Sequence, residues 1–129
     1  MGLIRTKTYI KYARINLQEA EQAFQKSEFK KCLNKVKSCT DALIKAVSAA
    51  LPSVKKDLFS LNERQFLTHL MDLCVDEEQP TKISKALYQA RTFSKDKDVN
   101  RESAEKALAQ AGNAFRGLHE IFGSLGKFT

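Results

Sequence analysis

The chain has few prolines, glycines and cysteines, the residues in which turn-rich and disulfide-bonded proteins are enriched. Its 129 residues include two prolines, five glycines, three cysteines and no tryptophan. Scarce Pro and Gly argue against a β-sandwich or barrel, because the many turns of those folds need these residues. An odd number of cysteines without CxxC spacing predicts reduced thiols in a cytoplasmic protein.

Long hydrophobic runs are also missing. No apolar stretch approaches the roughly 18 residues of a transmembrane helix, and the N-terminus lacks the apolar region of a signal peptide. The length suits a single domain spanning residues 1–129, large enough to bury a core without a metal or disulfide. We therefore expect a one-domain protein that contacts no membrane.

The sequence lacks the short motifs of several enzyme classes. It contains no Gly-rich phosphate loop, no GxSxG turn, no HExxH pair and no EF-hand loop. This argues against a self-sufficient kinase, dehydrogenase, hydrolase or zinc protease, and no cofactor is expected.

What the chain has in excess is positive charge, unevenly distributed. Lys and Arg number 22 against 15 Asp and Glu, for a net charge of +7. Residues 1–51 and 81–129 are basic, whereas residues 52–80 are acidic. A basic surface attracts polyanions, but interleaved lysines are also the ordinary solvent face of a helix bundle.

Apolar residues recur at alternating spacings of three and four, which predicts amphipathic helices. The first two are expected at 5–26 and 29–51, separated by a turn at Ser27-Glu28 and ended by Pro52. Their stripes include Ile10, Ala13, Leu17, Ala20, Phe24, Phe29, Leu33, Val36, Thr40, Leu43, Val47 and Ala50.

The second half predicts three more helices. One covers about 61–75, with a capping box from Ser60 to Glu63, and ends in an exposed loop over 76–80. A shorter helix capped by Thr81 follows.

The last helix runs over 100–122. Asn100 is its expected N-cap and Gly123 its C′ residue, and we expect Gly112 to permit a close helix crossing. No segment alternates with period two, so the fold class is all-α: an up-and-down bundle of four or five helices.

Three stretches resemble a HEPN domain (higher eukaryotes and prokaryotes nucleotide-binding). They are ARINLQEAEQAFQKSEFKKCLNKVKSCTDALIKAV at 13–47, KALYQARTF at 85–93 and DVNRESAEKALAQAGNAFRGL at 98–118. The resemblance covers roughly residues 10–122. It implies a helical bundle, often a homodimer, acting near nucleotides or RNA. It also implies either a metal-independent ribonuclease or a partner of a nucleotidyltransferase in a toxin–antitoxin pair.

Catalytic HEPN members carry R-x(4–6)-H near the last helices, and here that region, Arg91 to Arg101, contains no histidine. The literal match is Arg64…His69, which lies too early in the chain. Five residues place two helical side chains about 140° apart, so they do not act on one phosphate from one chain. A dimer cleft would have to bring together Arg64 and His69 from two copies of the chain. Histidine would then relay a proton, and arginine would stabilise the negative charge that develops on the phosphate.

For two other candidate sites we favour a structural role over a functional one. His69, Asp72 and Asp76 share a helix face that suits a weak divalent site, but a solvated acidic stripe is favoured and no metal is expected. Cys32 and Cys39 lie on an apolar face and are expected in the core.

The candidate contacts for a ligand or nucleic acid are basic. They are Lys30, Lys31, Lys35, Lys37, Arg91 and Arg101. Tyr9 and Tyr12, close to Lys7, Lys11 and Arg14, offer stacking against bases or partial burial. Ile121, Leu125 and Phe128 are candidates for an interface.

These features lead to one interpretation and two alternatives. The favoured one is a non-catalytic HEPN-like bundle that binds a nucleotide or a nucleotidyltransferase-type partner and forms a homodimer. The alternatives are a ribonuclease of the toxin type that uses Arg64 and His69, and a basic RNA-binding bundle.

Overall fold

The computed structural model describes residues 2–51, 63–74 and 78–126, and this part of the chain contains five α-helices and no strand. The predicted all-α, up-and-down bundle is confirmed. None of these helices is both long and apolar enough to cross a membrane. The helices are α1 (Gly2–Gln25), α2 (Phe29–Ala50), α3 (Glu63–Met71), α4 (Glu78–Ser94) and α5 (Arg101–Gly126).

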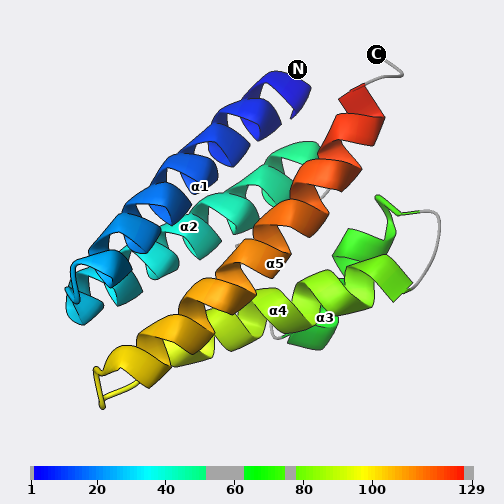
Figure 1. Cartoon of the computed structure of the whole chain (residues 1–129). Helices are drawn as coiled ribbons and strands as arrows, with labels where there is room; N and C mark the ends of the chain where they lie inside the picture. Colours follow the sequence, from blue (N-terminus) through cyan, green and yellow to red (C-terminus); the bar gives the residue numbers. More distant parts are fainter. Residues whose placement is uncertain (1, 52–62, 75–77, 127–129) are drawn as a thin grey trace.

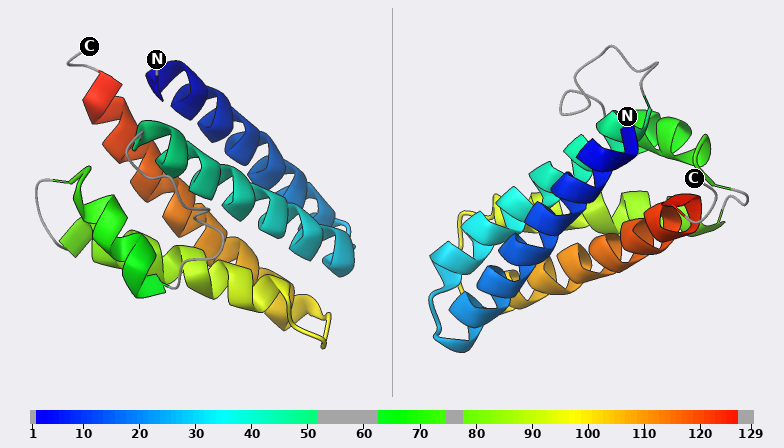
Figure 2. Two further views of the ribbon diagram at one scale, coloured as in Figure 1. Left: turned by 180° about the vertical axis from the view of Figure 1, so that it is seen from behind. Right: turned by 90° about the horizontal axis from the view of Figure 1, so that it is seen from above.

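The bundle is built from two antiparallel helix pairs (Figures 1 and 2). The pair α1–α2 forms one layer, and α4–α5 packs against it. Helix α5 contacts α1, α2 and α4, whereas α3 packs on α4. The first and last helices therefore lie next to each other, although they are the most distant in sequence.

The core consists of the stripes that the three-and-four spacing predicts. Ala13, Ala20, Ala104 and Ala111 are fully buried, so small side chains line the contacts of α1 and α5 and let the helices approach closely. Larger buried side chains fill the centre. They include Val36, Leu43, Ile44, Val47, Phe66, Leu70, Leu87 and Leu118.

The turn between α1 and α2 is a Schellman motif. Ser27 adopts a left-handed backbone conformation with φ 58°, and the Glu28 N–H donates to the Ala23 carbonyl at 2.9 Å. The Ser27 N–H donates to the Phe24 carbonyl at 3.0 Å. The predicted turn is thus confirmed, but backbone groups close it.

The predicted N-cap of α5 is also confirmed. The Ser103 N–H donates to Asn100 Oδ1 at 2.9 Å, and the Asn100 N–H donates to Ser103 Oγ at 3.1 Å. This reciprocal arrangement satisfies two amides at the helix start.

Helix boundaries near α3 and α4 differ from prediction. Helix α3 is shorter than expected, and Ser60 lies outside the described residues. Helix α4 begins at Glu78, so Pro80 lies in its first turn and Thr81 inside it, where we expected a loop and a cap. A proline fits there because the first-turn N–H groups have no intrahelical acceptor.

The glycines of α5 also correct the prediction. Gly123 does not end the helix, which continues to Gly126. The three atoms nearest to a Cβ on Gly112 would all belong to Arg116 of the same helix, the first of them at 3.2 Å. The close crossing lies at Gly117, where a Cβ would stand 2.5 Å from Ile83 Cγ1 of α4.

Of the predicted interface residues, Ile121 is the one whose side chain the structure describes. Ile121 is 6% exposed and belongs to the core. Leu125 and Phe128 lie outside the residues whose side chains the structure describes.

Candidate functional site

Three basic side chains form a stripe along α1. Lys7, Lys11 and Arg14 occupy positions i, i+4 and i+7, and all three are exposed. These positions fall within about 60° of one another around the helix, so the three cations lie on one side. That side faces the C-terminal half of α5.

The stripe borders a groove of about 320 Å³ between α1 and α5. Ile10 and Phe122, both nearly buried, form its apolar floor. His119 and Gly123 complete its α5 side, and none of the described residues that line it has a carboxylate. The groove is therefore positively charged on one wall and apolar at its base.

The position of the Arg14 guanidinium is fixed by two groups of α5. Its Nη2 lies 3.1 Å from His119 Nε2, and its Cζ lies 5.9 Å from the centre of the Phe115 ring. The His119 ring also packs on Phe115, with 5.6 Å between centroids. Arginine has no acceptor atom, so Nε2 must accept the hydrogen bond.

This hydrogen bond assigns the His119 tautomer, with the proton on Nδ1. The lone pair of Nε2 is already used by Arg14, so His119 is not positioned here to remove a proton from a substrate. Three cations and an apolar floor instead suit the binding of an anion that also carries an apolar part.

The predicted lysines of α2 lie elsewhere and do not converge. Lys35 Nζ lies 2.6 Å from Glu19 Oε2 of α1, and Lys31 Nζ lies 3.9 Å from Glu28 Oε2. Lys30 and Lys37 are exposed on a different side of the helix. Glu19 and Glu28 therefore offset much of the positive charge near Lys31 and Lys35.

Arg91 makes a contact between helices. Its Nη1 donates to Asp41 Oδ1 at 2.6 Å and to Thr40 Oγ1 at 3.2 Å, and its side chain is only 15% exposed. It thereby joins α4 to α2.

Arg101 also joins two elements. Its Cζ lies 5.1 Å from the centre of the Phe24 ring, a cation–π contact between the start of α5 and the end of α1.

Arg64 and His69 both lie on the short helix α3, Arg64 exposed and His69 half-buried. Within one chain they remain on different sides of the helix, as their spacing predicts. Asp72 follows α3 and is exposed, whereas Asp76 lies outside the described residues. Over residues 2–51, 63–74 and 78–126, no three metal-ligating side chains come together.

The prediction that Cys32 and Cys39 belong to the core is confirmed, because both are fully buried. Burial raises the pKa of Cys32 to about 11 and that of Cys39 to about 12. Both thiols are therefore protonated at neutral pH and poor nucleophiles.

Sequence reasoning identified one wall of the groove but not the groove. The spacing of Lys7, Lys11 and Arg14 indicates one basic helix face, but from the sequence we name these residues only as neighbours of Tyr9 and Tyr12. Tyr12 is half-exposed and Tyr9 partly buried. His119 carries no sequence signal for this site, because its partner Arg14 is 105 residues away.

Comparison with known proteins gives no relative: no family model, no curated protein and no solved structure matches the chain. The resemblance to HEPN domains therefore stays a prediction.

Proposed function

We propose that this chain is a non-catalytic, HEPN-like binding module that holds a nucleotide in the groove between α1 and α5. The observation that carries the proposal is the lining of this groove, in which the described residues include Lys7, Lys11 and Arg14 and no carboxylate. Phosphate oxygens suit the lysine and arginine donors, and the floor of Ile10 and Phe122 suits an apolar face of the base.

The volume also fits a small ligand. About 320 Å³ is near the lower end of the range for small-molecule sites, roughly 300–1,000 Å³. Because His119 Nε2 accepts from Arg14, the groove provides binding donors without an available base. This supports binding without cleavage.

The test is titration calorimetry with ATP at several salt concentrations. Charge-assisted hydrogen bonds contribute about 1.5–3 kcal/mol each, so Arg14→Gln should weaken binding tenfold or more. The variant Lys7→Gln/Lys11→Gln should do the same. Its matched control is Lys30→Gln/Lys37→Gln, which removes two exposed α2 lysines for the same change in net charge.

Equal losses in the two double variants would mean that net charge alone attracts ATP, and absence of ATP binding would end the proposal. A single-stranded RNA incubated with the protein tests the alternatives. RNA cleavage lost in His69→Ala would support the ribonuclease. Tight RNA binding with a steep salt dependence, together with no ATP binding, would support the RNA-binding bundle.

We also propose the homodimer that the resemblance implies, formed through the outer face of α1. Ile4, Tyr12 and Ile15 are 75%, 51% and 41% exposed and lie along that face. Exposed apolar residues grouped on one helix face are typical of protein contacts. Sedimentation equilibrium should show a dimer that Ile15→Glu dissociates, and a monomer at all concentrations would refute it.

Two further parts of the proposal concern the partner and the location. A nucleotidyltransferase-type partner follows from the resemblance, and copurification from the native host tests it. Three free cysteines, two of them buried, support a cytoplasmic location, where thiols stay reduced.

A further inference from the structure

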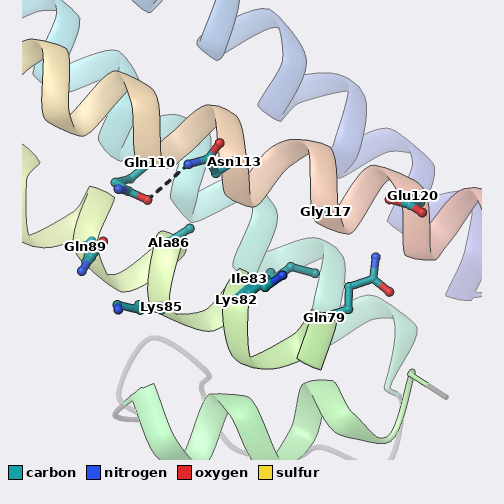
Figure 3. A pocket seen from close by; sticks show the side chains of 10 residues that line it. All are labelled: Gln79, Lys82, Ile83, Lys85, Ala86, Gln89, Gln110, Asn113, Gly117 and Glu120. Carbon is teal, nitrogen blue, oxygen red and sulfur yellow. Dashed lines mark hydrogen bonds between the residues drawn. The ribbon is translucent and has the colours of Figure 1, made fainter. Parts of the chain in front are cut away.

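A second and larger cavity of about 560 Å³ lies between α4 and α5. Its walls run from Gln79 to Gln89 on α4 and from Gln110 to Glu120 on α5 (Figure 3). Gly117 lines this cleft and His119 lines the nucleotide groove, and these positions are about 200° apart around α5. The two sites therefore open on opposite sides of one helix.

The cleft has a small apolar floor. Ile83 and Ala86 line it and are 3% and 6% exposed, and Ile83 meets α5 at Gly117. Because Gly117 has no side chain, the two helices approach closely there. Most of the residues that line the cleft are polar, and they come from both α4 and α5.

Carboxamides dominate this polar lining. Gln79 and Gln89 stand on α4, and Gln110 and Asn113 stand on α5 (Figure 3). Asn113 Oδ1 accepts from Arg116 Nη2 at 2.7 Å, which fixes the orientation of that amide. Asn113 Nδ2 also donates to Gln110 Oε1 at 3.5 Å (Figure 3). A carboxamide combines two N–H groups with an oxygen that has two lone pairs, the same donor and acceptor types that an extended peptide backbone presents in alternation.

We propose that this cleft binds an extended segment of a partner polypeptide, a site separate from the proposed nucleotide groove. Ten helical residues span about 15 Å. An extended chain rises about 3.3 Å per residue, so the cleft holds about five residues. A helical partner fits less well, since its own backbone is already satisfied and it needs a wide apolar surface.

The charges along the cleft predict which charges the bound segment carries. A neighbouring cavity of about 500 Å³ shares Gln89 and Gln110 and continues the cleft to Glu105. Given the antiparallel contact of Ile83 with Gly117, Lys85 and Glu105 lie about 15 Å apart along the axis. The segment therefore carries an acidic residue near Lys85 and a basic residue about five positions away, near Glu105.

The same charges disfavour a polyanion. Lys82, Lys85 and Glu120 line the cleft, and Glu102, Glu105 and Lys106 line its continuation. Lys82 pairs with Glu78 at 2.9 Å and Lys106 with Glu102 at 3.0 Å, so the lining carries both signs of charge. By contrast, none of the described residues that line the nucleotide groove has a carboxylate. Nucleic acid would meet repulsion here that a peptide of mixed charge avoids.

The test uses fluorescence polarisation with labelled heptapeptides. One has an aspartate and a lysine five positions apart, separated by serines and threonines, and the comparison peptides have two like charges or none. We expect the mixed-charge peptide to bind most tightly. Gln110→Ala/Asn113→Ala should weaken its binding about tenfold, because two side-chain hydrogen bonds to the peptide backbone are lost.

The matched control is Gln18→Ala/Gln25→Ala, which removes two exposed carboxamides from α1 and should change binding less than twofold. Arg14→Gln should leave peptide binding unchanged, which separates this proposal from the nucleotide groove. No binding of any heptapeptide to the folded protein would overturn the proposal. So would equal losses in the two double variants, or a preference for a peptide of like charges.

Discussion

The crossing of α4 and α5 predicts that one added methyl group destabilises the protein at Gly117 but stabilises it at positions without a close neighbour. A Cβ on Gly117 would lie 2.5 Å from Ile83 Cγ1 and 2.8 Å from Ile83 Cδ1. Favourable carbon contacts need about 3.5–4.0 Å, so Gly117→Ala forces the helices apart or Ile83 out of position. Overpacking of this kind costs about 2–3 kcal/mol.

The change also has a favourable part. Alanine stabilises a helix interior by about 1 kcal/mol relative to glycine. The net loss for Gly117→Ala is therefore about 1–2 kcal/mol. With an unfolding entropy of about 2.1 cal/mol/K per residue, 1 kcal/mol corresponds to about 4 °C here, so Tm should fall by about 4–8 °C.

Two comparisons make the result specific to the contact. For Gly112→Ala the nearest atoms belong to the Arg116 guanidinium, which can move, so Tm should rise by about 4 °C. In an Ile83→Ala background the obstruction is gone, and Gly117→Ala should then stabilise by about 1 kcal/mol. Thermal unfolding followed by circular dichroism measures all four variants. If Gly117→Ala is as stable as Gly112→Ala in the natural background, the close crossing is wrong.

Three further predictions concern stability. Ser27→Gly should raise the free energy of unfolding by up to about 1 kcal/mol in urea titrations, because φ 58° suits glycine; a loss would contradict the turn. Asp41→Ala should cost about 1–3 kcal/mol, and less when Arg91→Met is already present; additive losses would contradict the ion pair. Above pH 9 the buried thiols of Cys32 and Cys39 stay protonated in the folded state but ionise in the unfolded state. Stability should therefore fall between pH 9 and 11 by up to about 1.4 kcal/mol per pH unit and thiol, a slope that Cys32→Ala/Cys39→Ala should reduce.

The bundle was predictable because its helices carry long, regular apolar stripes. Ala13, Ala20, Leu43 and Leu118 are buried as their spacing requires, since one face of each helix must leave water. The Asn100 cap was predictable for a similar reason, because its hydrogen bonds reach only three residues along the chain.

The errors arose where local signals have two meanings. The sequence predicts a loop over 76–80 and a cap at Thr81, yet the helix begins at Glu78, because a proline in the first turn costs no intrahelical hydrogen bond. Gly112 and Gly117 look alike in sequence, and only the position of Ile83 on another helix distinguishes them.

The candidate sites needed information that periodicity does not contain. Lys7, Lys11 and Arg14 share a helix face by spacing alone, but the pairing of Arg14 with His119 depends on how α1 packs against α5. Likewise, Arg91 is a predicted phosphate contact, and its pairing with Asp41 depends on how α4 packs against α2.

The placement of the first and last helices side by side has a consequence during synthesis. A ribosome releases α1 early, but the opposite wall of the groove between α1 and α5 comes late, since His119 lies 105 residues after Arg14. A growing chain can form the α1–α2 pair while this groove has only one wall. Premature termination before α5 would thus leave a partly helical product in which the groove has no second wall.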